Sequence, residues 1–254
     1  CMGDPNGEAD ENPPGRVAID RPFWMGACEV TNEQYRRFDP ANDSGYLTKL
    51  RAERFSPGPL LNGPKQPVVR VSWEQAMAFC RWLSARTRSA GPGQAGLEFS
   101  LPAEAQWEYA CRAGSAAPLS YGSVAADFSR WANVADLRIA RGAYIREAVT
   151  ISYPADGRFD DGHTVTAPAG SYRPNTWGLY DMHGNAAEWT LTTYSPYPYK
   201  ANDGRNDGSP TGRKAVRGGS FFDRPKRCRS AFRLAYPAWQ CISDVGFRVA
   251  APAE

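Results

Sequence analysis

The sequence predicts a single compact α/β domain of the α+β type, spanning residues 1–254, with low regular secondary structure. A chain of 254 residues can bury a sizeable core, and no obvious boundary divides it. Its 24 Gly and 21 Pro favour turns and loops. Its 8 Trp, 12 Tyr and 11 Phe are more than a disordered chain carries. We therefore expect a folded domain in which many loops are ordered without forming helices or strands.

The first elements are predicted to be short strands and a helix. Val17-Ala18-Ile19 and Phe23-Trp24-Met25 are interpreted as the first strands. Thr31 and Gln34 have the spacing of a capping box, in which each side chain bonds the other residue's backbone N–H. A helix is therefore expected to begin after Thr31 and to carry Tyr35 inward.

Two further helices follow in the first half of the chain. Ser72 and Gln75 form a second capping box. Apolar residues then recur at helical spacing, at Ala76, Phe79, Cys80 and Leu83. Residues 103–112 are predicted to form the next helix, which ends near Gly114.

The remaining segments are predicted to be loops and a β-rich C-terminal part. Residues 40–66 and 195–212 are rich in Gly, Pro and polar residues, which indicates long surface loops. Residues 228–234 alternate as a strand does, with Arg229 and Arg233 on one side. We interpret the basic side as a solvated sheet face, and a site for phosphate or an acidic peptide is the alternative.

Composition excludes some classes of function. The net charge of +3 is too small to indicate a nucleic-acid partner. No apolar run is long enough for a membrane span. The six cysteines lack the C-x-x-C spacing of structural zinc sites. The chain opens at Cys1, so any targeting peptide is expected to have been removed or to lie outside it.

The segment 178–190 (GLYDMHGNAAEWT) is the strongest candidate for a binding site. A turn at Gly184-Asn185 would bring the carboxylates of Asp181 and Glu188 towards each other. Calcium takes carboxylate and carbonyl oxygens together, so this arrangement suits a calcium ion. In the alternative interpretation, both carboxylates accept backbone N–H groups and fix a long loop.

A second pair of oxygen-bearing residues, Asn133 and Asp161, lies in the stretch between the third helix and residue 178. Long loops inside a compact domain are usually functional or held by something other than secondary structure. A cation is one such restraint. Ordinary Asx-turns are the alternative.

Several motifs, in the same order along nearly the whole chain, resemble the formylglycine-generating enzyme family, also called the sulfatase-modifying factor domain. They are Met2-Gly3, Phe23-Trp24-Met25-Gly26 with Glu29-Val30-Thr31-Asn32-Glu33-Gln34-Tyr35, Pro67-Val68-Val69-Arg70-Val71-Ser72-Trp73 with Ala76 and Phe79-Cys80, Leu101-Pro102-Ala103-Glu104 with Trp107-Glu108-Tyr109-Ala110, GLYDMHGNAAEW at 178–189, Val216-Arg217-Gly218-Gly219-Ser220, and Gly246-Phe247-Arg248. The resemblance implies a fold related to C-type lectins and stabilised by calcium.

The resemblance also implies which residues bind calcium. One site would use the side chains of Asp181 and Glu188 with the carbonyls of Gly184 and Ala186. The other would use the side chains of Asn133 and Asp161 with the carbonyls of Val134 and His163.

The catalytic centre departs from the family pattern. Family members that oxidise a sulfatase cysteine to formylglycine have two cysteines, five residues apart, that bind copper. Here Ser220 and the second cysteine, Cys228, match, but Asp223 replaces the first. Ala187 stands where the family has Trp, and Asp244 where it has Asn. Because soft Cu(I) prefers thiolates, copper is not expected.

Cys241 offers one alternative route to a complete pair. It precedes Gly246 in the sequence, and with Cys228 it would form a rebuilt two-thiolate copper site or a disulfide.

Three functional hypotheses follow. The first is a calcium-stabilised domain without copper-dependent oxidation that binds a peptide, glycan or protein. The second is an oxidoreductase of the same family whose altered pocket contains Ser220, Asp223, Cys228 and Asp244. The third is residual formylglycine generation through Cys228 and Cys241. Whether the chain is an enzyme stays open, and the resemblance favours a location outside the cytoplasm.

Overall fold

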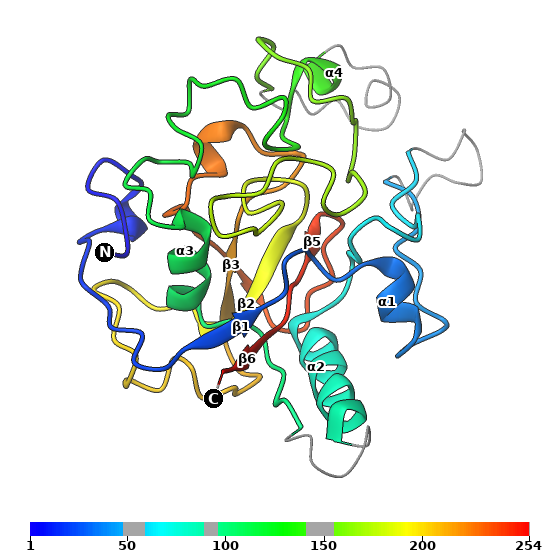
Figure 1. The fold of residues 1–254 in the computed structure, drawn as a ribbon, viewed down its shortest axis with the longest axis vertical. Helices are drawn as coiled ribbons and strands as arrows, with labels where there is room; N and C mark the ends of the chain where they lie inside the picture. Colours follow the sequence, from blue (N-terminus) through cyan, green and yellow to red (C-terminus); the bar gives the residue numbers. More distant parts are fainter. Residues whose placement is uncertain (48–58, 89–95, 141–154, 254) are drawn as a thin grey trace.

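A four-stranded sheet lies at the centre of the fold, and the segment 178–190 leads directly into it. It contains β2 (Ala187–Thr193), β3 (Arg213–Arg217), β4 (Leu234–Pro237) and β5 (Val245–Gly246). The order is β4-β3-β2-β5, and β2 and β5 are parallel while the other neighbours are antiparallel. Figure 1 shows these strands surrounded by loops. This computed structural model describes residues 1–47, 59–88, 96–140 and 155–253.

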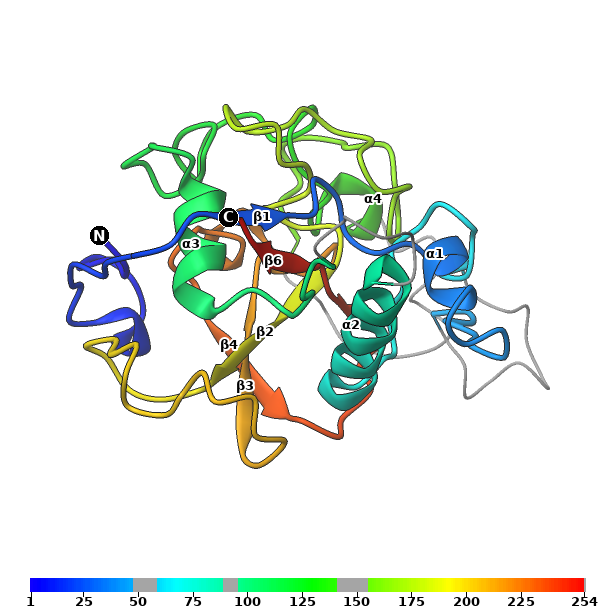
Figure 2. The ribbon, with the colours of Figure 1, turned by 60° about the horizontal axis from the view of Figure 1, so that its bottom comes forward.

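A second sheet joins the two ends of the chain. It pairs β1 (Phe23–Met25) with β6 (Ala250–Pro252) in antiparallel fashion, with Phe23 opposite Pro252. Figure 2 shows β1 and β6 crossing between α3 and α2.

The helices among the described residues are η1 (Ala9–Glu11), α1 (Asn32–Arg36), α2 (Trp73–Arg88), α3 (Glu104–Arg112), α4 (Leu137–Ala140) and η2 (Pro225–Arg227). Two of them, α1 and α2, begin where the capping boxes predict. Thr31 and Gln34 form the predicted capping box at α1. Ser72 and Gln75 do the same at α2, with Ser72 N–H donating to Gln75 Oε1 at 2.8 Å. No helix among the described residues is long and apolar enough to cross a membrane.

Aromatic rings from α1 and α2 pack against the central sheet. Tyr35 stacks on Phe79 with 5.4 Å between ring centroids, and both contact Phe247 edge to face. Trp189 of β2 is fully buried in the same cluster. This packing anchors the start of β2 and the loop before it.

Two local predictions differ from the structure. Residues 17–19 do not form a strand, and β1 is the only described strand before α1. The predicted strand 228–234 is mostly turn, and β4 begins only at Leu234. Arg229 and Arg233, which were expected on a solvated face, are 5% and 3% exposed. The prediction was wrong because distant carboxylates compensate both guanidinium groups.

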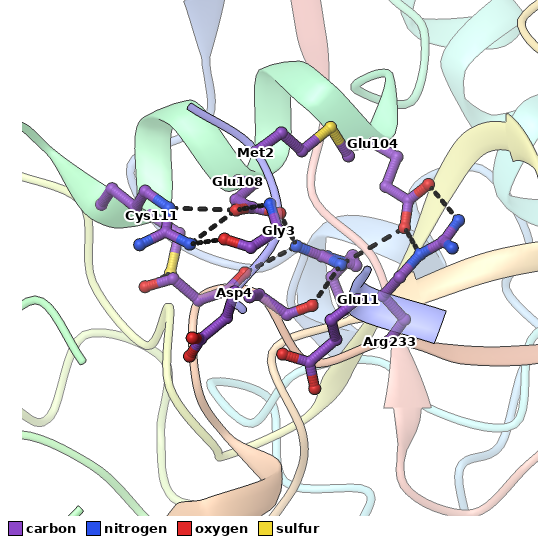
Figure 3. A network of polar contacts seen from close by, with 12 residues as sticks. Met2, Gly3, Asp4, Glu11, Glu104, Glu108, Cys111 and Arg233 are labelled. Carbon is purple, nitrogen blue, oxygen red and sulfur yellow. Dashed lines mark hydrogen bonds and ion pairs between the residues drawn. The ribbon is translucent and has the colours of Figure 1, made fainter. Parts of the chain in front are cut away.

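These arginines belong to an ion network between the N-terminal segment, α3 and the segment after β3 (Figure 3). Arg233 binds both carboxylate oxygens of Glu104 at 2.6 and 2.8 Å. Arg229 binds both oxygens of Glu11 at 2.7 and 2.6 Å. The fully buried Arg217 contacts Glu104 and, at 2.5 Å, Glu108. The network fixes α3 against the end of β3, from which the candidate pocket starts.

Candidate functional site

The candidate pocket begins at two glycines that follow β3. Gly218 and Gly219 have φ angles of +94° and +66°, which favour residues without a side chain. A Cβ at Gly219 would lie 2.6 Å from the Cys228 sulfur and 2.8 Å from the Arg227 carbonyl oxygen. This turn reverses the chain and places the next residue, Ser220, beside Asp244.

The hydroxyl of Ser220 lies between two carboxyl groups. Its Oγ is 2.7 Å from Asp244 Oδ2 and 3.1 Å from Asp223 Oδ2. It also accepts the Phe222 backbone N–H at 3.2 Å. A hydroxyl has one proton and can donate to one of the two carboxylates. The other contact is favourable when that carboxyl group carries a proton, so the three side chains share a proton.

The contacts of Asp223 and Asp244 indicate which of the two carboxyl groups holds the shared proton. Asp223 accepts the Ser220 backbone N–H at 3.1 Å and pairs with Arg227 at 3.0 Å, two contacts that favour its ionised form. Burial nevertheless raises its pKa. Burial, and then the charge of Asp223, raise the pKa of Asp244 to about 6, against the opposing hydrogen bond from Ser220. Asp244 is therefore the more readily protonated of the pair.

Cys228 lies beneath this pocket and is fully buried. Its Sγ is 3.8 Å from the carbonyl oxygen of Asp223. Burial, followed by the charge of Asp223, raises the pKa of the thiol well above its ordinary value. At neutral pH the group is a thiol rather than a nucleophilic thiolate.

The structure does not bring Cys241 to Cys228. Neither thiol is in a disulfide, and Cys241 is exposed with its Sγ 3.7 Å from Gln75 Oε1. Cys228 instead packs among buried apolar residues that include Phe128 and Val134. The alternative of a disulfide or a two-thiolate site is thus not supported, because Cys228 is buried in that cluster whereas Cys241 lies at the surface.

The donor atoms of this pocket do not fit copper. Asp223 supplies a hard carboxylate where soft Cu(I) prefers a second thiolate beside Cys228. Ala187, where the family has Trp, is buried at the start of β2 and donates its N–H to the Asp244 carbonyl at 2.9 Å.

The calcium candidate at Asn133 and Asp161 contains a buried oxygen that bonds no described residue. Asn133 Oδ1 has no hydrogen bond to a described residue, whereas its Nδ2 is bonded to Val165 and Asn185. Asp161 accepts the backbone N–H of His163 and of Val134, each at 2.9 Å. The bond to His163 is an Asx-turn, so that alternative is present at Asp161 but does not account for Asn133.

The electrostatics at Asn133 and Asp161 also suit a cation. Burial, with the nearby charge of Asp136, raises the pKa of Asp161 to about 7. No described hydrogen-bond donor reaches the carbonyl oxygens of Val134 and His163. Asn133, Asp161 and the two carbonyls therefore fit a hard cation such as calcium.

The calcium candidate at Asp181 and Glu188 has the same kind of free oxygen. Asp181 Oδ1 is buried and no described residue donates to it, and Oδ2 of the same side chain accepts the Gly170 N–H at 2.6 Å. A Cβ at Gly184 would lie 2.1 Å from the Asn133 carbonyl oxygen, so this close turn requires glycine. Burial raises the pKa of Asp181 to about 6.

Glu188 is engaged differently from Asp181. Arg248 Nε donates to both of its oxygens at 2.9 and 2.7 Å, and Trp107 Nε1 donates at 2.7 Å. Neither interpretation of the sequence included these two partners. Buried Glu29, Asp181 and Glu188 lie around the guanidinium of Arg248. Burial, followed by the charges of Asp181 and Glu188, raises the pKa of Glu29 well above its ordinary value, and a bound cation would favour the ionised carboxylates.

Sequence reasoning gave Glu29 and Arg248 no role, although both lie in the family motifs. Glu29 accepts the Ala186 N–H at 2.9 Å and the Asn185 side-chain amide at 2.7 Å, and thereby shapes the turn before β2. Within the described ranges, no group of three or more His, Cys, Asp or Glu side chains is arranged to hold a metal. Both candidates accordingly depend on backbone carbonyls and an amide as well as carboxylates.

His183 hydrogen-bonds the backbone of Cys228 and so fixes one wall of the pocket. Its Nε2 accepts the Ser120 backbone N–H at 2.9 Å, so Nδ1 carries the proton and donates to the Cys228 carbonyl at 2.7 Å. Burial lowers the pKa of His183 to about 4. The ring is a neutral structural group at physiological pH.

Comparison with known proteins now identifies the family. The model of the sulfatase-modifying factor enzyme 1-like domain matches residues 2–253. The chain belongs to this family. The formylglycine-generating enzyme of Bos taurus is 30% identical over 286 residues, which cover 95% of this chain and 68% of that protein.

Two further relatives of this sulfatase-modifying-factor-type domain bear on its fold and function. The inactive C-alpha-formylglycine-generating enzyme 2 of Mus musculus is 24% identical, covering 98% of this chain and 81% of that protein. The structure of PvdO from Pseudomonas aeruginosa superposes with a TM-score of 0.69 at 26% identity, covering 99% of this chain and 90% of that one. The predicted mixed α/β fold is confirmed.

Proposed function

We propose that this formylglycine-generating-enzyme-like domain does not oxidise cysteine with copper and instead binds a peptide, glycan or protein partner. The observation that carries the proposal is Asp223 at the position of the first copper cysteine, above a Cys228 thiol that is fully buried. The replacement of one ligand of the pair by a carboxylate removes a soft donor that the copper reaction needs. The mouse relative whose name calls it inactive supports loss of activity within the family.

Calcium is the second part of the proposal. Asn133 Oδ1 and Asp181 Oδ1 are buried acceptors that no described donor reaches, and such atoms are costly unless a ligand or water satisfies them. Bound calcium would neutralise nearby carboxylates and hold the turn at Gly184 against Asn133. We infer that calcium stabilises the loops that surround the central sheet.

The partner would bind at exposed loops on this scaffold. Loop 195–212 is described throughout, whereas part of the expected loop 40–66 lies outside the described residues. Arg205 anchors loop 195–212, since it pairs with Asp203 at 2.7 Å and packs over the Tyr199 ring. A rigidly held loop loses little conformational entropy on binding. A location outside the cytoplasm stays part of the proposal.

A metal-free enzyme is the second candidate, favoured by the shared proton at Ser220. Half-buried Asp244 reaches solvent and holds a proton near pH 6, so it has the properties of a general acid or base. Oxidoreductase chemistry in the altered pocket would use Asp244 and Asp223 for proton transfer. The buried Cys228 thiol argues against its use as the nucleophile.

Copper(I) titration of the reduced protein, with calcium present, separates the copper hypotheses. We expect no stoichiometric tight binding, and Cys228→Ala is expected to behave like the unmodified protein. Tight binding that disappears in Cys228→Ala would refute the proposal. Incubation with copper and a sulfatase cysteine peptide tests residual formylglycine generation directly, and the expected result is no aldehyde product.

A further inference from the structure

Residues 16–21 form an extended segment whose backbone groups make no hydrogen bond to a described residue. Gly15 bonds Met2 at one end, and Pro22 accepts the Ala253 N–H at the other. Between them, no backbone N–H or C=O makes a hydrogen bond to a described residue. Val17 and Ile19 are half-buried while Ala18 and Asp20 are exposed, the alternation of a strand that lacks its neighbour.

The free edge continues into β1. Gly26 N–H donates to Val249 at 2.8 Å, and Ala253 N–H donates to Pro22 at 3.0 Å. In an antiparallel ladder, every second residue exchanges hydrogen bonds with its partner. Residues 22, 24 and 26 therefore face β6, and the N–H and C=O groups of Phe23 and Met25 point to the opposite edge.

Two cavities lie along this segment. One, of about 690 Å³, is lined by Met2, Val17, Ile19 and Tyr109 among others. The other, of about 590 Å³, is lined by Ile19, Phe23, Tyr109 and Trp177 among others. Ile19 and Tyr109 border both, so the two cavities form one groove beside residues 16–25, which we call the β1 groove.

The aromatic wall of the β1 groove is exposed yet rigid. Tyr109 and Trp177 are 51% and 48% exposed, and their rings meet edge to face at 4.9 Å. Asn175 fixes the turn that carries Trp177, because it donates to the Ala110 carbonyl at 2.8 Å and accepts the Trp177 N–H at 3.0 Å. Large apolar side chains held in solvent are typical of a preformed recognition surface.

We propose that the β1 groove binds an extended peptide, which adds as a strand to the free edge of β1 and residues 16–21. Unpaired backbone donors and acceptors in a row match another extended backbone. Alternate side chains of a strand lie about 7 Å apart on one face, so neighbouring ones would enter the two cavities. This inference rests on the proposed binding function, names an extended peptide as its partner class, and places that partner in the β1 groove instead of on loop 195–212.

The charged residues of segment 16–21 indicate which peptides the β1 groove favours. Arg16 and Arg21 are exposed at the two ends of the unpaired segment, with Asp20 next to Arg21. The carboxylates that line the first cavity, Asp4 and Glu108, are paired with Arg229 and Arg112. Exposed Arg16 and Arg21 therefore favour acidic residues at the ends of the bound peptide. The preferred ligand is an extended peptide with apolar residues at every second position and acidic flanks.

The test uses an array of twelve-residue synthetic peptides with this pattern. The best binder is then measured in solution by fluorescence anisotropy, with calcium present. Its copy N-methylated at alternate residues keeps every side chain but loses half of its backbone donors. We expect that copy to bind at least tenfold more weakly, because strand addition depends on backbone hydrogen bonds.

Variants locate the site. Trp177→Ala and Tyr109→Ala are each expected to weaken peptide binding by about tenfold, as loss of a central aromatic contact does. Trp239→Ala is the matched control, because Trp239 is 71% exposed and lines neither cavity. Its affinity is expected to be unchanged, and thermal unfolding confirms that each variant is folded.

Several outcomes would overturn the inference while leaving the proposed function intact. They are no peptide binding at millimolar concentration, equal binding of the N-methylated copy, equal effects of all three variants, or binding in the groove by an oligosaccharide instead. Copper binding at Cys228, by contrast, would remove the proposed function without bearing on the β1 groove.

Discussion

At the scale of single residues, Asp244 can donate a hydrogen bond as the family's Asn does, but unlike Asn it can also ionise. Where the family pattern has Asn, Asp244 stands 2.7 Å from Ser220. A protonated carboxyl group donates a hydrogen bond as an amide does. The raised pKa of Asp244, caused first by burial, therefore allows the acid to take the place of Asn below about pH 6. Above that pH a negative charge appears beside Asp223.

The replacement Asp244→Asn tests this account. The folded pKa of Asp244, about 6, exceeds the ordinary value, so its stabilising contribution is present below about pH 4 and is lost as the pH rises to about 6. Because Asp244 is partly exposed, we expect a modest effect, roughly 1 kcal/mol. Urea unfolding at pH 4.5 and 7.5, with calcium present, should show Asp244→Asn gaining stability relative to the unmodified protein at the higher pH. Equal differences at both pH values would contradict the shared proton.

Thiol reactivity gives a second prediction at this scale. A maleimide at pH 7 should label exposed Cys1 and Cys241 within minutes and Cys228 only after denaturation, since the Cys228 thiol is buried and its pKa is raised. Mass spectrometry of digested protein measures each site, and Cys241→Ser confirms the assignment. Labelling of native Cys228 as fast as Cys241 would favour a catalytic thiol.

At the scale of elements, α3 is held by charge as well as by apolar packing. Glu104 and Glu108 project from one face of α3 to meet Arg217 and Arg233 (Figure 3). Removing one member of a buried pair leaves an uncompensated charge and costs about 3–5 kcal/mol.

We therefore expect Glu104→Gln to lower the free energy of unfolding by about 3 kcal/mol. The matched control is Glu98→Gln, because Glu98 is 62% exposed in its pair with Arg88. Exposed pairs contribute about 1 kcal/mol or less. Urea unfolding at pH 7 compares the two variants. A Glu104→Gln protein as stable as the control would show that the network does not hold α3.

The sequence could predict interactions between residues close together in the chain, but not those between residues far apart. The capping boxes at Thr31 and Ser72 involve residues three positions apart, and both were confirmed. The environment of Arg229 was not predictable, because its partner Glu11 lies 218 positions away. At the candidate site, the family motifs indicated Asp181 and Asn133 as ligands, but they could not reveal that Arg248, 60 positions from Glu188, occupies that carboxylate.

At the scale of the whole molecule, calcium is expected to raise the thermal stability in a pH-dependent way. Burial raises the pKa of Asp161 to about 7 and that of Asp181 to about 6 in the metal-free protein. Protons and calcium compete for these carboxylates, so the ion should bind more tightly at higher pH. We expect a rise of several degrees in Tm with 1 mM calcium at pH 8, and a much smaller rise at pH 5.5.

Differential scanning calorimetry with calcium or a chelator measures this effect. Asp181→Asn should reduce the calcium-dependent rise in Tm, whereas Asp207→Asn, on an exposed turn, should leave it unchanged. Equal Tm values with calcium and chelator at pH 8 would refute the calcium proposal.

The pairing of β1 with β6 bears on the order in which the molecule can be assembled during synthesis. The ribosome releases Phe23 to Met25 long before Ala250 to Pro252, and Glu11 long before Arg229. The early half therefore emerges with a strand and acidic side chains whose partners do not yet exist. The native pairings of β1 with β6 and of Glu11 with Arg229 must wait until residues 229–252 have emerged, and until then these N-terminal groups lack their partners.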